Sequence, residues 1–123
     1  MAYLHDDILD NGLAALSGDN RVLHICSAEP ATYANVTSYT LGNKAGPTIG
    51  AVGDRTGSGR KRTISAVTDG TVTGTDTATH WALVDTTATA RLLAAAALSA
   101  SQVVTSGNTF TLAAFDIGIP DPA

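Results

Sequence analysis

Three histidines and one cysteine are the side chains of this 123-residue chain best suited to binding a metal ion. His24 and Cys26 alternate in one β-like stretch and His80 lies in another, so the three side chains can meet across a sheet as ligands. The repeated spacings Cys-x-x-Cys and His-x-x-x-His, which metal sites commonly use, do not occur. We therefore interpret the histidines as structural and Cys26 as a small buried hydrophobic residue. The sequence predicts no metal site and no cofactor.

Catalytic residues are not indicated either. A serine nucleophile needs a neighbouring base, and the elbow Gly-x-Ser-x-Gly is absent, with Gly57-Ser58-Gly59 the nearest match. Glu29 is the only glutamate, which excludes acid–base catalysis by a pair of glutamates. The ten aspartates lie at expected helix starts and turns, where capping accounts for them. We predict that the protein is not an enzyme.

A basic segment is the main electrostatic feature of the sequence. Residues 44–62 hold five bases and one acid, whereas residues 1–43 and 63–123 each hold one base and five acids. The segment is not a Walker A phosphate loop, which requires Gly-x-x-x-x-Gly-Lys-Ser/Thr before a helix. One interpretation is an arm that grips phosphate or an acidic neighbouring subunit, and the other is a solvated flexible loop. The candidate partner-binding residues are Arg55, Arg60, Lys61 and Arg62.

Composition excludes several other classes of protein. The net charge is −4 with a pI near 5.0, which disfavours nucleic-acid binding because that function usually needs a basic domain or face. The longest apolar stretch, residues 92–98, is far shorter than the roughly 20 residues of a membrane span. The acidic first residues are unlike a secretory signal, and a single cysteine forms no internal disulfide. We expect a cytosolic site of synthesis and assembly and no membrane partner.

The N-terminal half predicts a helix, two strands and then a glycine-rich segment. Within an N-terminal helix assigned to residues 1–19, leucines at 9, 13 and 16 share one face and Gly18 ends the helix. Residues 21–27 alternate as a strand with both faces covered, residues 31–36 form a short turn, and residues 37–41 form a weaker strand. Glycines then favour a long loop or arm over residues 42–62.

Residues 63–119 predict a β-meander. Strands are expected at 63–68, 71–77, 78–85, 91–98 and 109–119, with a hairpin turn at Asp69-Gly70, another turn at Ser106-Gly107-Asn108 and a bulge near Ala113-Ala114. Trp81 and Leu83 should face one side of their strand. Propensity alone favours a helix at 91–98, but the regular spacing of the flanking strands favours a strand. The fold class is therefore mainly β: one domain over residues 1–123, a β-sandwich or flattened barrel of about seven antiparallel strands.

Several segments of the chain resemble small virion structural proteins of tailed bacteriophages. The resemblance covers most of the sequence and rests on Ile25–Pro30, Gly57–Lys61, Thr79–Asp85, Leu92-Leu93, Leu98–Leu112 and Phe115–Ile119. It implies a β-rich assembly component located in the virion, with no catalytic residues to carry over.

The resemblance favours a capsid decoration, or cement, protein. Such a protein would bind the major capsid protein and copies of itself, typically as a trimer, and the basic arm would pair with acidic capsid surface. One alternative is a tail, neck or connector component of the same particle. The other is a small carbohydrate-binding module, which requires exposed aromatic side chains, although Trp81, Phe110 and Phe115 occupy positions typical of a core.

Overall fold

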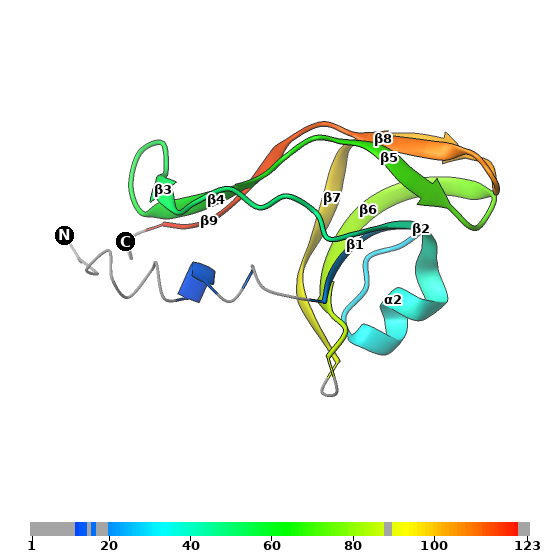
Figure 1. Cartoon of the computed structure of the whole chain (residues 1–123), viewed down its shortest axis with the longest axis horizontal. Helices are drawn as coiled ribbons and strands as arrows, with labels where there is room; N and C mark the ends of the chain where they lie inside the picture. The colour runs from blue at the N-terminus through cyan, green and yellow to red at the C-terminus, as the bar shows by residue number, and fades with distance from the viewer. Residues whose placement is uncertain (1–11, 15, 17–19, 88–89, 121–123) are drawn as a thin grey trace. The chain divides into compact units, whose positions relative to one another are not determined.

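The protein is mainly β, as predicted. A computed structural model describes residues 12–14, 16, 20–87 and 90–120. Within residues 20–87 and 90–120 it contains nine strands and one helix (Figure 1). These elements are β1 (Arg21–Cys26), α2 (Tyr33–Tyr39), β2 (Thr40–Ala45), β3 (Gly53–Asp54), β4 (Arg60–Ile64), β5 (Val67–Val72), β6 (Asp76–Asp85), β7 (Arg91–Val104), β8 (Thr109–Leu112) and β9 (Phe115–Ile119).

Two compact units make up the described chain. The first contains the three-stranded antiparallel sheet β3-β4-β9, and the second contains the six-stranded antiparallel sheet β7-β6-β1-β2-β5-β8. The chain passes between units at residues 47–48, 66–67 and 112–113. A single domain over residues 1–123 stays a prediction. We call the two parts the small-sheet unit and the large-sheet unit.

The predicted N-terminal helix falls mostly outside the described residues. Residues 12–14 are helical, and Leu13 and Leu16 are buried in the small-sheet unit. The other residues on which that helix was predicted, including Leu9 and Gly18, are not described. No helix in the described part of the chain is both long and apolar enough to cross a membrane.

The centre of the large-sheet unit is the antiparallel pair β1 and β6. Leu23 and Ile25 lie opposite Leu83 and Trp81, and all four side chains are buried. Cys26, on the other face of β1, is also buried. Both faces of β1 are therefore covered, which confirms the expected strand at residues 21–27 and its alternation.

Helix α2 covers one of these faces. The Thr32 side chain caps the helix by accepting a hydrogen bond from the Asn35 N–H (3.2 Å). Val36 is fully buried and packs in one cluster with Cys26, Ala82 and Val84. The predicted strand at residues 37–41 is wrong in its first three positions, because burial of Val36 extends the helix to Tyr39.

The glycine-rich arm predicted over residues 42–62 is instead partly strand. Strand β2 pairs with both β1 and β5, and β3 and β4 form a hairpin at the other end of the segment. A Cβ atom at Gly42 would lie 2.4 Å from the Thr71 carbonyl oxygen, so glycine permits close approach of β2 and β5. Loops remain at residues 46–52 and 55–59.

The expected hairpin turn at Asp69-Gly70 is also wrong. Strand β5 continues through both residues, with an irregularity in its pairing with β8 between Val67 and Gly70, and Gly70 pairs with Phe110 of β8. A Cβ atom at Gly70 would lie 2.2 Å from the buried Phe110 ring. Glycine is required there to make room for an aromatic side chain rather than to turn the chain.

Nested pairing replaces the meander predicted for residues 63–119. Strand β6 pairs with β7, β5 with β8, and β4 with β9. The strand prediction for residues 91–98 is confirmed by β7, and Gly107 at φ +91° confirms the turn that follows it. The bulge predicted near Ala113-Ala114 within one strand is wrong: β8 ends at Leu112, and β9 begins at Phe115 in the other sheet.

The six-stranded sheet is curled, as Figure 1 shows. Its edge strands are β7 and β8, and the Gln102 side-chain amide of β7 donates a hydrogen bond to the Thr111 carbonyl of β8 (2.9 Å). Two irregularities in the pairing of β7 with β6 accompany this curvature. The strand count exceeds the predicted seven because β3 was not expected and the strand predicted at residues 109–119 is divided into β8 and β9.

Candidate functional site

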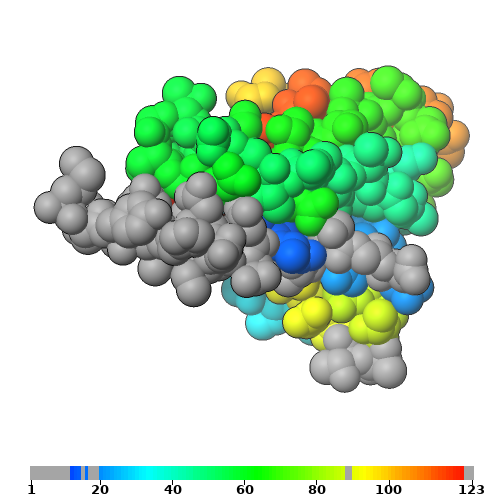
Figure 2. All heavy atoms as spheres, turned by 60° about the vertical axis from the view of Figure 1, so that its left-hand side comes forward, coloured from blue at the N-terminus to red at the C-terminus, as the bar shows by residue number. Residues whose placement is uncertain are grey.

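The basic residues of the predicted arm gather on the small-sheet unit. Arg60, Lys61 and Arg62 are consecutive on β4, opposite Ile119, Gly118 and Ile117 of β9. The loop before β4 is a tight turn in which the Arg55 N–H donates to the Gly59 carbonyl (3.1 Å). Residues 54–58 are exposed, and Figure 2 shows spheres from this green part of the chain at the surface.

Two of the four candidate residues stabilise the unit itself. Arg60 Nη1 donates to Asp54 Oδ1 across the β3–β4 hairpin (2.6 Å). Arg62 Nε donates to the Gly50 carbonyl (2.7 Å), and its Nη1 lies 3.5 Å from the Leu13 carbonyl. These contacts hold loop and strand together, so Arg60 and Arg62 have a structural use.

Lys61 is held by a carboxylate on the adjacent strand. Its Nζ donates to Asp116 Oδ2 (2.9 Å), while the Thr63 hydroxyl donates to Asp116 Oδ1 (2.6 Å). The hydrogen bond from Thr63, together with the contact from Lys61, lowers the pKa of Asp116. Asp116 is therefore ionised at neutral pH and fixes the position of the lysine.

Arg55 is positioned differently. Among the described residues its guanidinium hydrogen-bonds only to the Ser58 carbonyl (3.1 Å), and no carboxylate pairs with it. Its side chain lies against Gly118, where a Cβ atom would come within 3.0 Å of Arg55 Cδ. Gly118 thus provides the space in which the arginine lies along β9.

A surface hollow of about 370 Å³ brings these groups together. It is lined by Arg55, Thr56, Lys61, Asp116 and Gly118. Over its full sequence ranges, residues 1–18, 48–66 and 113–123, this unit carries four bases and six acids, and all four bases lie on β4 or in the loop before it. The hollow is the candidate functional site, and it can bind an anionic group.

The histidines and cysteine that were considered as metal ligands, and interpreted as structural, lie on one face of the large sheet. Strand pairing places Cys26 opposite His80, and His24 is two residues before Cys26. Burial raises the pKa of the Cys26 thiol to about 11 and lowers the pKa of His24. Within residues 20–87 and 90–120 no group of three or more His, Cys, Asp or Glu side chains is arranged to hold a metal ion.

Both histidine rings are hydrogen-bonded to threonine hydroxyls. The Thr40 hydroxyl donates to the Gly42 carbonyl, so its oxygen accepts from His24 Nδ1 at 2.8 Å. The Thr79 hydroxyl likewise donates to the Ser27 carbonyl and accepts from His80 Nδ1 at 2.8 Å. The histidines thus link neighbouring backbone segments through threonine, as structural residues do.

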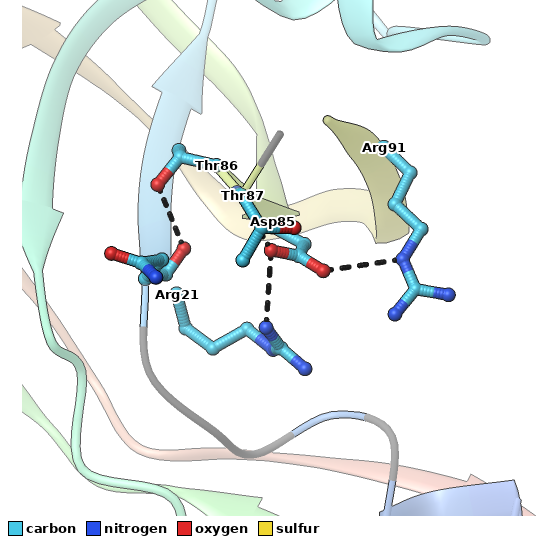
Figure 3. A network of polar contacts seen from close by, with 6 residues as sticks. Arg21, Asp85, Thr86, Thr87 and Arg91 are labelled. Carbon is cyan, nitrogen blue, oxygen red and sulfur yellow. Dashed lines mark hydrogen bonds and ion pairs between the residues drawn. The ribbon is translucent and has the colours of Figure 1, made fainter. Parts of the chain in front are cut away.

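A buried carboxylate between two arginines is a feature that the sequence reading missed (Figure 3). Asp85 is 3% exposed, and its Oδ1 accepts from the Thr87 N–H (3.0 Å) and lies 3.3 Å from Arg21 Nη1. Arg91 Nε donates to Asp85 Oδ2 (3.2 Å). The Thr87 hydrogen bond first, and then the arginines, lower the pKa of Asp85. The network joins the ends of β1, β6 and β7.

Asp85→Asn is expected to lower the midpoint of thermal unfolding at pH 7 and to flatten the acid end of the stability profile. The folded state lowers the pKa of Asp85 from 3.8, so its charged form adds stability above that value, and this stability is lost as the pH falls further. Thermal unfolding followed by circular dichroism between pH 2 and pH 7 tests this. Asp69→Asn, at an exposed aspartate paired with Lys44, is the matched control. Identical profiles for Asp85→Asn and the wild type would contradict the assignment.

The described aromatic side chains serve the core. Trp81 and Phe110 are buried, Tyr33 and Tyr39 pack against the cluster beneath α2, and Phe115 is partly buried. None of these five is exposed on a face that could stack a sugar ring.

Comparison with known proteins found no match to this chain. No protein-family model matches the chain, and neither a curated protein nor a solved structure matches it.

Proposed function

We propose that the protein is a structural component of a tailed-bacteriophage virion, a capsid decoration protein that binds the major capsid lattice through its small-sheet unit. The observation that carries this proposal is the gathering of four bases, three on β4 and Arg55 in the loop before it, within an acidic chain. The resemblance of the sequence to small virion proteins supplies the class of partner.

Electrostatics supports this mode of attachment. Two of the four bases are used within the unit, and the other two line an exposed hollow. An acidic surface on the partner would be attracted to the local cluster of bases on β4 and in the loop before it. Attachment of this kind weakens as salt concentration rises, since exposed charges are screened.

The large-sheet unit would provide the rigid body of the protein. Its sheet is curled, and Gln102 links the edge strands β7 and β8. We propose that this sheet corresponds to the flattened barrel expected from the sequence. Only 15% of residues are charged, which limits repulsion between copies packed in a lattice. We propose a homo-oligomer, a trimer, as the form that binds the shell.

Lys61→Ala should weaken binding to empty shells of the major capsid protein about tenfold, a change of about 1.4 kcal/mol. The substitution removes a cation from the hollow and leaves Asp116 to repel an acidic partner. Binding is measured by co-sedimentation of the purified protein with shells that lack it, at two salt concentrations.

Lys44→Ala is the matched control for this experiment. Lys44 also pairs with one aspartate, at 3.1 Å against 2.9 Å for Lys61, and the two lysine side chains are 31% and 30% exposed. It lies in the large-sheet unit, so we expect wild-type binding. Equal losses in both variants would show that general charge, rather than the small sheet, attracts the shell.

A further inference from the structure

We infer that the hollow beside β9 is a receptor for a single carboxylate group, with Arg55 as the residue that binds it. The inference rests on the proposed function in one respect, since the carboxylate would belong to an acidic segment of the capsid partner. It goes further by naming the ligand chemistry and by separating Arg55 and Lys61 from the other two bases.

Arg55 has the donors that such a ligand needs. A guanidinium carries five N–H donors in a planar fork, and one nitrogen of Arg55 donates to the Ser58 carbonyl. The two oxygens of a carboxylate match two parallel donors of this fork. Because Arg55 is exposed and unpaired with any carboxylate of the described residues, the group can approach without displacing an internal ion pair.

The arginine is also held in place before binding. The loop is closed by the hydrogen bond between the Arg55 N–H and the Gly59 carbonyl, and the side chain lies against Gly118. Ordering a long side chain on binding normally costs conformational entropy, which weakens the affinity. Because these contacts already restrict the Arg55 side chain, binding a ligand incurs less of this cost.

The other walls of the hollow complete the site. Lys61 has three N–H donors, of which one contacts Asp116, and the Thr56 hydroxyl also lines the hollow. Two cations and one anion give the hollow a net charge of +1. A ligand with a single negative charge, such as one carboxylate, would neutralise this net charge.

Asp116 contributes the one negative charge of the hollow. Its carboxylate is kept ionised by Thr63 and Lys61 and forms part of the wall. Because a guanidinium fork pairs with a carboxylate and with a phosphate alike, the choice of an acidic protein segment as the ligand rests on the proposed capsid partner.

The test is a nuclear magnetic resonance titration of the ¹⁵N-labelled full chain with a blocked tetraglutamate peptide, and separately with inorganic phosphate at matched ionic strength. We expect the peptide to shift the Arg55 side-chain Nε–H signal and the amide signals of Thr56 and Gly118, saturating at roughly millimolar concentration. Arg55→Ala should abolish these shifts. Arg55→Lys keeps the charge but loses the fork, and should bind at least about fivefold more weakly. Lys44→Ala should bind as the wild type does.

Each outcome decides the inference. Absence of the peptide shifts in the wild type overturns it, and so does stronger binding of phosphate, which would show that the hollow is a phosphate site. Peptide binding at the hollow without any binding of the wild type to shells would refute the proposed function and leave the carboxylate site standing. Shell binding by Arg55→Ala at the wild-type level, together with no peptide shifts in the wild-type protein, would refute the site and leave the function standing.

Discussion

Trp81→Ala is expected to lower the free energy of unfolding by about 3–5 kcal/mol. The indole is 7% exposed, and its strand lies between two others, with Ile25 opposite on β1 and Ala96 opposite on β7. Removing it leaves a cavity in the sheet that the paired strands cannot close. Urea denaturation followed by far-ultraviolet circular dichroism measures the change, since the variant has no tryptophan to report by fluorescence.

Val103→Ala provides the control for the tryptophan variant. Val103 lies on β7 of the same unit but is 83% exposed, so its truncation should change stability by less than about 0.5 kcal/mol. A neutral effect of Trp81→Ala would show that the indole does not fill the core and would reopen a ligand-stacking function.

Gly59→Ala is expected to destabilise the small-sheet unit by at least about 2 kcal/mol and to separate β9 from β4. Gly59 has φ +88°, a conformation that costs energy for any residue with a Cβ atom. That Cβ atom would also lie 2.0 Å from the Ile119 carbonyl oxygen and 2.6 Å from Pro120 Cα. Amide hydrogen exchange across residues 115–119 should report the loss of pairing.

Gly57→Ala separates backbone strain from steric overlap as the cause of the effect expected for Gly59→Ala. Gly57 has φ +94° in the same loop, but a Cβ atom there meets nothing within 4 Å. This variant should incur the backbone strain alone and keep residues 115–119 protected from exchange. If both variants exposed β9 to the same degree, the close packing of Gly59 against residues 119–120 would not be what holds the strand.

The parts of the fold predicted correctly are those whose signals are local. The alternation in β1 and β6 is visible in the sequence because both strands bury side chains on alternate faces. The strand β7 was predicted against its alanine-rich propensity from the spacing of its neighbours, and pairing with β6 confirms that reasoning.

The errors in the fold come from glycines whose role is tertiary. Gly42 and Gly70 suggested loop and turn, yet each lies within a strand where a neighbouring element comes too close for a side chain. The approaching groups, the Thr71 carbonyl and the Phe110 ring, are 29 and 40 residues away in sequence. No local pattern records such contacts.

The candidate site was predictable as a region but not in its details. Charge counting found the four bases, since five bases lie in residues 44–62. It could not show which of these bases are held by contacts within the protein, because the carboxylate that pairs with Lys61 is Asp116, 55 residues further along. The same limitation hid Asp85, whose partner Arg21 lies 64 residues earlier.

A cryo-electron-microscopy reconstruction of the particle that contains this chain, with its copies counted, tests the central claim most directly. We predict hundreds of copies spread over the shell, with the small-sheet unit of each facing an acidic surface of the major capsid protein and a glutamate or aspartate next to Arg55. A few copies on a single axis, at the tail or neck, would contradict a decoration function.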